Sequence, residues 1–121
     1  MSDWPYKNFS REEMACKHCG KEGIKPEFME RLQQLRTAYN ATMPISSAYR
    51  CPDHPVEKRK GSIAGTHALG IAADIAVQGK DAHRLLSLAL QFGFKGIGVQ
   101  QKGSGRFIHI DLRDSETIWS Y

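Results

Sequence analysis

The sequence His67-Ala-Leu-Gly-Ile-Ala-Ala-Asp74, together with the later sequence Phe107-Ile-His109-Ile-Asp111, decides the fold and the chemistry expected of this chain. The two segments supply two imidazoles and a carboxylate, on His67, His109 and Asp74. Such a set is typical of a catalytic zinc ion, because three protein ligands leave a fourth position for water. A structural zinc site is usually closed by four protein ligands. The set therefore predicts a metal centre that is open to a substrate.

Both segments alternate in the way that half-buried strands do. Side chains two residues apart share a face of a strand. Within residues 71–76, Asp74 points away from the face that Ile71, Ala73 and Ile75 form, and within residues 107–112, His109 shares its face with Phe107 and Asp111. Each strand can bury an apolar face and present a ligand on the other, while Gly70 lets the chain bend so that His67 meets Asp74. The alternative is a pair of ordinary strands with incidental polar residues.

The remaining pattern predicts a small α+β domain with a mostly antiparallel sheet that carries the site. Ser10 and Glu13 form a capping box that starts a helical turn, and a longer helix begins at Pro26 with Phe28, Leu32, Leu35 and Tyr39 at helical spacing. The other expected elements are a strand over residues 44–49, a long loop over 51–66, a helix over 81–92 with Leu85, Leu86, Leu88 and Ala89 inward and Gly93 at its end, and a hairpin of strands 96–101 and 106–112.

Length and composition fit one soluble domain over residues 1–121. The chain is 40% hydrophobic and 25% charged, as ordinary globular proteins are, and no apolar run has membrane-spanning length. Its start lacks the basic and apolar stretches of a secretory signal, so we expect a monomer made in the cytoplasm, with no membrane partner. The net charge of +4 suits an anionic polymer. The positive residues are dispersed apart from residues 57–60, so no nucleic-acid partner is expected.

Three motifs in order give this chain a family resemblance. Ser46-Ser47-Ala48-Tyr49-Arg50, then residues 67–74, then residues 107–111, resemble the zinc D-Ala-D-Ala carboxypeptidases and phage endolysins, a family of peptidoglycan peptidases. The match runs from about Phe9 to the region of Trp119. That family shares its fold with the hedgehog signalling domain, so the resemblance implies a hedgehog/DD-peptidase-like fold.

The resemblance also implies a site and a substrate. His67, Asp74 and His109 would be the zinc ligands, and Arg50 would bind a substrate carboxylate or polarise the scissile carbonyl. The substrate would be a peptide of peptidoglycan, cleaved at D-Ala-D-Ala, at L-Ala-D-Glu or at a cross-bridge. Because the chain shows no secretory signal, a phage lysis system or a similar release would have to deliver it to the cell wall.

Two positions depart from the family pattern. Gly65 stands where members often carry a Ser, and Arg106 stands where some carry the acidic general base. Asp111 is the nearest substitute, since it shares the face of His109. It would act either as the general base or as a carboxylate that orients a ligand histidine; Asp53 and Glu57 of the long loop are other acids to consider. The missing acid also favours an alternative function, a catalytically inactive, zinc-stabilised binding module of the same fold.

The cysteines suggest a second site. Cys16-Lys-His-Cys19 and Cys51-Pro-Asp-His54 have the ligand count and spacing of a structural zinc site, in which Cys16, Cys19, Cys51 and His54 would be the ligands. A disulfide from Cys51 to one of the first two, or three free thiols, are the competing interpretations, and His18 could replace one cysteine. His83, on the second long helix, is expected to be an ordinary surface or packing histidine.

Overall fold

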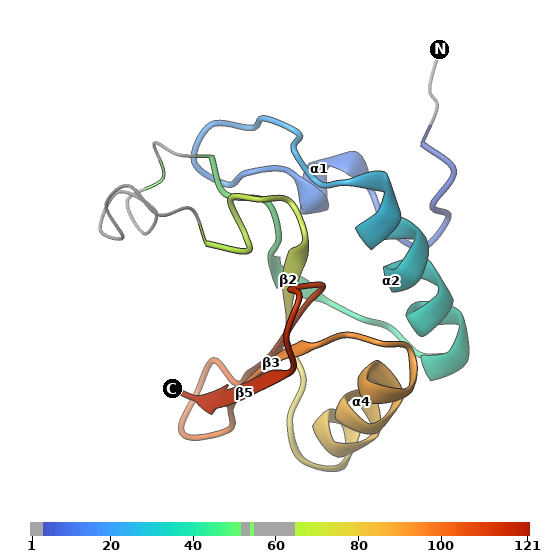
Figure 1. Ribbon diagram of the computed structural model, residues 1–121, viewed down its shortest axis with the longest axis vertical. Helices are drawn as coiled ribbons and strands as arrows, with labels where there is room; N and C mark the ends of the chain where they lie inside the picture. Colours follow the sequence, from blue (N-terminus) through green and yellow to red (C-terminus); the bar gives the residue numbers. More distant parts are fainter. Residues whose placement is uncertain (1–3, 52–53, 55–64) are drawn as a thin grey trace.

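The computed structural model describes residues 4–51, 54 and 65–121 of the chain. The helices and the first four strands follow the predicted order, and a fifth strand, Thr117–Ser120, is added to them; the fold class is α+β, as expected (Figure 1). The elements are α1 (Arg11–Met14), α2 (Pro26–Tyr39), β1 (Ile45–Ser47), β2 (Ala72–Ile75), α4 (Gly79–Gln91), β3 (Gly96–Gln100), β4 (Phe107–Asp111) and β5 (Thr117–Ser120). Most of the predicted loop, including Asp53, Glu57 and the basic run 58–60, lies outside the described residues.

The five strands form one sheet in the order β1-β2-β4-β3-β5. The first three neighbouring pairs are antiparallel, and the predicted hairpin of β3 and β4 is confirmed. The last pair, β3 with β5, is parallel, so the sheet is mixed and the expectation of a mostly antiparallel sheet needs this correction. The reason lies in the connection after β4, which crosses the start of β3 so that Thr117 pairs with Gly96 and β5 runs in the direction of β3.

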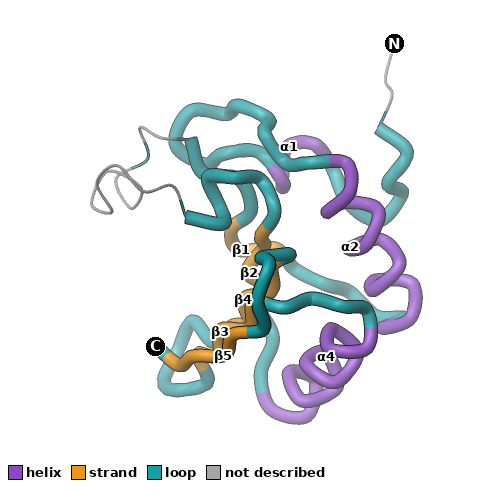
Figure 2. Tube along the Cα trace, viewed as in Figure 1, coloured by secondary structure: helices purple, strands orange, loops and turns teal. Residues whose placement is uncertain are grey.

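Helices α2 and α4 pack against one face of this sheet, and the opposite face is left to the site (Figures 1 and 2). The predicted apolar stripe of α2 is buried, and Asn40 in the left-handed conformation (φ 53°) ends the helix. In α4, Leu85 and Ala89 are buried as expected, while Leu86 and Leu88 are partly buried against the same core. The predicted capping box of α1 is present, with the Ser10 hydroxyl accepting from the Glu13 amide at 3.1 Å.

The two faces of the central strands separate apolar from polar side chains, as the alternation predicted. Ala73 and Ile75 of β2, with Ile108 and Ile110 of β4, belong to the hydrophobic core beneath the helices. Asp74, His109 and Asp111, on the alternate positions, are buried polar residues. The core therefore fixes which way the candidate ligands face. No helix of the described part of the chain has the length and apolar character needed to cross a membrane.

Candidate metal centre

Strand pairing places the strand-borne candidate ligands in one row across the sheet. Asp74 of β2 lies opposite Ser47 of β1 on one side and opposite His109 of β4 on the other. The row continues through Gly98 of β3 to Trp119 of β5. Directly opposed residues of an antiparallel pair have neighbouring side chains. The register therefore brings Asp74 and His109 together, although they are far apart in the sequence.

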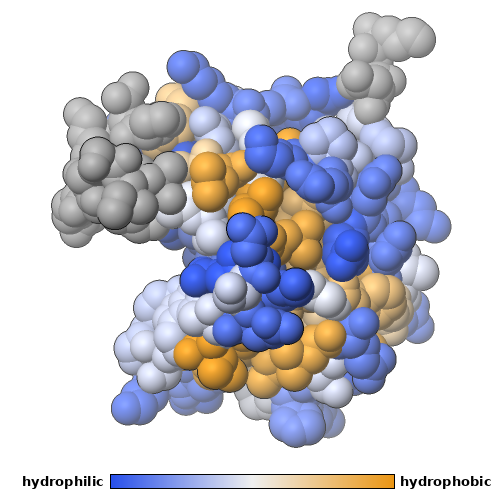
Figure 3. Space-filling view, viewed as in Figure 1, coloured by the Kyte–Doolittle hydropathy of each residue, from blue (hydrophilic) through white to orange (hydrophobic). Residues whose placement is uncertain are grey.

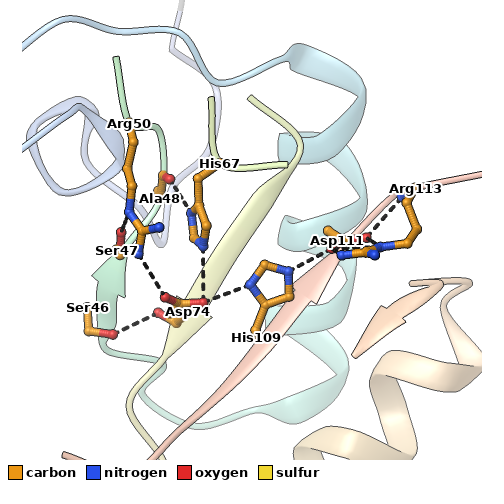
Figure 4. A network of polar contacts seen from close by, with 9 residues as sticks. All are labelled: Ser46, Ser47, Ala48, Arg50, His67, Asp74, His109, Asp111 and Arg113. Atoms are coloured by element: carbon orange, nitrogen blue, oxygen red, sulfur yellow. Dashed lines mark hydrogen bonds and ion pairs between the residues drawn. The ribbon is translucent and has the colours of Figure 1, made fainter. Parts of the chain in front are cut away.

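His67 completes a compact group with these two residues (Figure 4). Its Nε2 lies 3.3 Å from Oδ1 of Asp74, and Nδ1 of His109 lies 2.9 Å from the same oxygen. All three side chains are buried, and their donor atoms lie within 4.8 Å of one another. The structure thus brings together the whole set that the sequence predicted.

The turn before β2 aims His67 at the sheet. Gly70 has a positive φ of 77°, a conformation that glycine adopts without strain. Its amide donates to the His67 carbonyl at 3.2 Å, and its carbonyl accepts from the Lys25 amide at 2.8 Å. A side chain at Gly70 would collide with the carbonyl of Gly23. The bend expected at Gly70 is therefore both tight and tied to the segment before α2.

Hydrogen bonds on the outer side of each imidazole decide which nitrogen faces Asp74. Nδ1 of His67 lies 2.6 Å from the carbonyl oxygen of Ala48, which only accepts, so Nδ1 donates to that oxygen and Nε2 is the nitrogen that faces Asp74. Nε2 of His109 lies 2.6 Å from Oδ2 of Asp111 and donates to it, which leaves Nδ1 as the inner atom. Such outer partners commonly fix the tautomer of metal-binding histidines. Both inner nitrogens therefore converge on the Asp74 carboxylate, and each can become a metal ligand once its proton is lost.

The electrostatics of the site favour a positive charge beside the Asp74 carboxylate. Burial raises the pKa of Asp74, but hydrogen bonds from His109 and His67 outweigh burial and hold that pKa well below its usual range. For His109, burial lowers the pKa, and Asp111 and Asp74 together raise it above its ordinary value. A proton on His109 can supply the charge in the metal-free chain. A metal ion would displace that proton, because metal ligands bind in their deprotonated form.

Asp111 is a fully buried carboxylate on the far side of His109. Besides His109, it accepts from Arg113, through Nε at 3.0 Å and Nη2 at 2.7 Å. Burial raises its pKa, but the bonds from His109 and Arg113 lower it far below the ordinary value. Asp111 is not among the residues that line the adjacent cavity. Of the two roles that the sequence left open, this position favours orienting His109.

Arg50 lies on the opposite side of Asp74 from His109 (Figure 4). Its Nη2 is 3.5 Å from Oδ2 of Asp74, and its Nε donates to the hydroxyl of Ser47 at 3.2 Å. The side chain also lines the cavity. Arg50 therefore contacts a candidate metal ligand, Asp74, and also faces the cavity. A residue that contacts the substrate needs such a position.

The group lies in a cavity of about 670 Å³. In Figure 3 the outline of the molecule is notched directly above the C-terminal strand, whose end is marked in Figure 1. The lining residues are Arg50, Gly65, Thr66, His67, Asp74, Phe107, His109, Arg113, Trp119 and Tyr121. This size and the mixture of apolar and convergent polar groups are typical of small-molecule and peptide sites.

Sequence reasoning missed one wall of this cavity. Trp119 and Tyr121, at the end of the chain, form it with Phe107; the Trp119 ring centroid lies 5.0 Å from that of His109, and the Tyr121 centroid 5.0 Å from that of Phe107. The Arg113 guanidinium stacks over Trp119 at 4.5 Å. Gly98 makes room, because a side chain there would collide with the Trp119 indole. The alternation Thr117-Ile-Trp119-Ser was the available signal, but it gives no pairing partner.

The cysteines form the second group of candidate ligands. Cys16 and Cys51 are buried, Cys19 is exposed, and the three sulfur atoms lie within 4.8 Å of one another as free thiols. Burial raises the pKa of Cys16, but hydrogen bonds from the backbone of Cys51, Cys19 and His18 bring it down to about 7. His54 does not belong to this close group; its ring lies 5.9 Å from that of His18. His83 is exposed on α4, as expected.

Comparison with protein families supports the motif resemblance. The family model described as Peptidase M15 matches residues 7–111, which include both histidines and the aspartate of the cavity. No curated protein matches the sequence significantly.

Proposed function

The chain belongs to the peptidase M15 family, and on that premise we propose that it hydrolyses a peptide bond in peptidoglycan with a zinc ion held by His67, Asp74 and His109. The observation that carries the proposal is the convergence of two imidazole nitrogens and an ionised carboxylate at the cavity. The proposed unit is one domain over residues 1–121, acting as an endolysin-like carboxypeptidase or endopeptidase.

The donor set fits zinc. Nitrogen and carboxylate ligands with one open position are those of catalytic zinc sites, and the bonds to Ala48 and Asp111 already hold the outer nitrogen of each imidazole, so that the inner one is left for a metal ion. When bound, zinc acts as a Lewis acid towards a peptide carbonyl and lowers the pKa of a coordinated water to about 7. The chain contributes the position of the three donors and the cavity in front of them.

Arg50 is proposed to hold the substrate. It lines the cavity beside Asp74, so its guanidinium can reach the carbonyl oxygen or a carboxylate of a peptide bound there. A cation at that place stabilises the negative charge that develops on the carbonyl oxygen. The bond from Nε to Ser47 fixes the direction in which the guanidinium points.

Asp111 is proposed to position His109. Its bond to Nε2 keeps Nδ1 directed at Asp74, and Arg113 holds the carboxylate in turn. Because Asp111 is fully buried and does not line the cavity, a water molecule in the cavity has no direct route to it. We therefore assign the orienting role rather than that of the general base.

The charge and shape of the cavity walls favour a peptide substrate that carries free carboxylates. Arg50 and Arg113 bring positive charge, and Phe107, Trp119 and Tyr121 bring flat apolar surface. The net charge of +4 favours an approach to an anionic polymer. Peptidoglycan, the substrate that the motif resemblance implies, has this chemistry. Peptidoglycan lies outside the cytoplasm, and release of the protein in phage lysis or a similar process is the route to it that we propose.

One observation favours a second candidate, an inactive zinc-stabilised binding module. Among the described residues that line the cavity, Asp74 is the only carboxylate, and it is a proposed ligand. A peptidase needs a group that accepts a proton from water, whereas a binding module does not.

Incubation with purified peptidoglycan, followed by mass spectrometry of the released fragments, separates the two candidates. The peptidase should release peptides whose new ends identify the cleaved bond, and neither a chelator-treated sample nor His109→Ala should do so. His83→Ala, which changes an exposed histidine on α4, serves as the matched control and should behave as wild type. Binding to peptidoglycan without any released peptide would favour the binding module.

A further inference from the structure

The three thiols join two segments that are distant in the sequence. Cys16 and Cys19 lie in the turn after α1. Cys51 lies after β1 and directly follows Arg50. None of the three lies on a helix or strand. Nothing in the proposed hydrolysis uses them, and the sulfur atoms lie within 4.8 Å of one another without a disulfide.

Backbone hydrogen bonds around Cys16 bring the three sulfur atoms close together. The Cys16 amide donates to the Lys21 carbonyl at 2.9 Å, and the Gly20 amide donates back to the Cys16 carbonyl at 2.8 Å. Gly20 has a positive φ of 75°, which closes the turn that carries Cys19. The Cys51 amide in turn donates to Sγ of Cys16 at 3.3 Å. A hydrogen bond from an amide to sulfur stabilises the thiolate form, which is the form that binds metal.

We propose that Cys16, Cys19 and Cys51 bind a second, structural zinc ion. Thiolate ligands select soft and borderline metals such as zinc over magnesium or calcium. Tetrahedral zinc with bonds of about 2.3 Å places sulfurs about 3.8 Å apart, and the three sulfurs, all within 4.8 Å of one another, are compatible with this spacing. We assign the fourth position to an imidazole: His18 lies within the turn of Cys16 and Cys19, and the His54 amide donates to the Cys51 carbonyl at 3.0 Å.

Three consecutive amides connect this group to the cavity. The Tyr49 amide donates to the Met14 carbonyl, the Arg50 amide to the His67 carbonyl, and the Cys51 amide to Sγ of Cys16, each at 3.3 Å. The backbone of Arg50 is thus held between the thiol group and the His67 segment. The zinc ion would keep Arg50 in place beside Asp74; this consequence rests on the proposed function, whereas the metal site itself does not.

Metal content and cobalt spectroscopy test the site on the whole chain. Wild type should hold two zinc ions per chain, and Cys51→Ser and His109→Ala should each hold one. In cobalt-substituted protein, a sulfur-to-cobalt charge-transfer band should appear in wild type and in His109→Ala, which is the matched control because it keeps every cysteine. The band should be absent from Cys51→Ser.

Several outcomes would overturn the proposal. One zinc ion in wild type that disappears in His109→Ala, or a cobalt spectrum of wild type without the sulfur band, excludes the thiol site. A chain mass lower by two hydrogen atoms shows a disulfide in its place. If Cys51→Ser does not fold, the wild-type spectrum still decides. A protein that shows the sulfur band but releases no peptide from peptidoglycan keeps this site and loses the proposed hydrolysis.

Discussion

Asp74 and His109 lie on paired strands above a packed core, whereas Cys16, Cys19 and Cys51 all lie outside the helices and strands. At the first group, the register of the sheet and the bonds to Ala48 and Asp111 set the direction of each donor before any metal binds. At the second, a turn and backbone hydrogen bonds to the Cys16 sulfur do so.

This difference separates two uses of a metal ion. The sheet holds the proposed ligands in place without a metal ion, so a metal ion there would add chemistry at an open cavity. The thiol group lies on loops outside the helices and strands, so a metal ion there would add folding free energy, as structural zinc does. We therefore expect removal of the first metal to cost activity with little loss of fold, and removal of the second to loosen the segment that carries Arg50.

The largest effect should follow His109→Ala. The variant loses a ligand at the open site, so its activity on peptidoglycan should fall by more than the hundredfold to thousandfold that removal of a single transition-state donor costs. Circular dichroism should show an unchanged fold, and elemental analysis should show one metal ion fewer than in wild type. A variant with wild-type metal content would show that His109 is not a ligand.

Arg50→Ala should lower the turnover rate by about a hundredfold to a thousandfold, the cost of losing one charge-stabilising donor. Its metal content should stay at the wild-type value, because Arg50 contacts Asp74 from the side opposite His109. Arg50→Lys is the matched variant: it keeps the positive charge but loses the planar guanidinium group. Its turnover rate should lie between those of wild type and Arg50→Ala. Wild-type turnover in Arg50→Ala would refute a role in catalysis.

Asp111→Asn should weaken zinc binding by about tenfold to a hundredfold, as loss of a partner behind a ligand histidine does. At saturating zinc its turnover should approach the wild-type rate. The exposed substitution Asp114→Asn should change neither quantity. Full zinc occupancy combined with a rate loss of about a hundredfold to ten-thousandfold would instead make Asp111 the general base.

Gly98→Ala should have the smallest effect. The added methyl group would collide with the Trp119 indole, and overpacking of this kind costs about 1–3 kcal/mol in the free energy of unfolding. Denaturant unfolding measures the change. Adding Trp119→Ala to the same chain removes the collision, so the double variant should lose less stability than the two single changes together; strict additivity would show that the collision does not matter.

The parts of the fold that the sequence predicted are those set by local periodicity. The apolar spacing of α2 and the alternation of β2 and β4 are properties of neighbouring residues, and the structure confirms them. β5 was missed because Thr117–Ser120 is short and mostly exposed, and only its pairing with β3 makes it a strand. The parallel pair and the aromatic wall around Trp119 were missed with it.

The candidate site divides in the same way. Motif order was enough to nominate His67, Asp74 and His109, which the structure brings together. The sequence placed Asp111 on the face of His109 but did not show that Arg113 and full burial keep it away from the cavity. It also grouped His54 with the cysteines, whereas only the three sulfurs form the close group. Such distinctions depend on side-chain packing between segments, which spacing does not encode.

The most direct test of the central claim is to strip wild-type protein of metal, add zinc back in steps, and measure bound zinc and released peptide on the same samples. We expect no peptide release from the stripped protein and full recovery on zinc addition. His109→Ala, treated identically, should take up zinc only at the thiol site and stay inactive. Peptide release by fully stripped wild type at the original rate would contradict hydrolysis at the His67, Asp74 and His109 site.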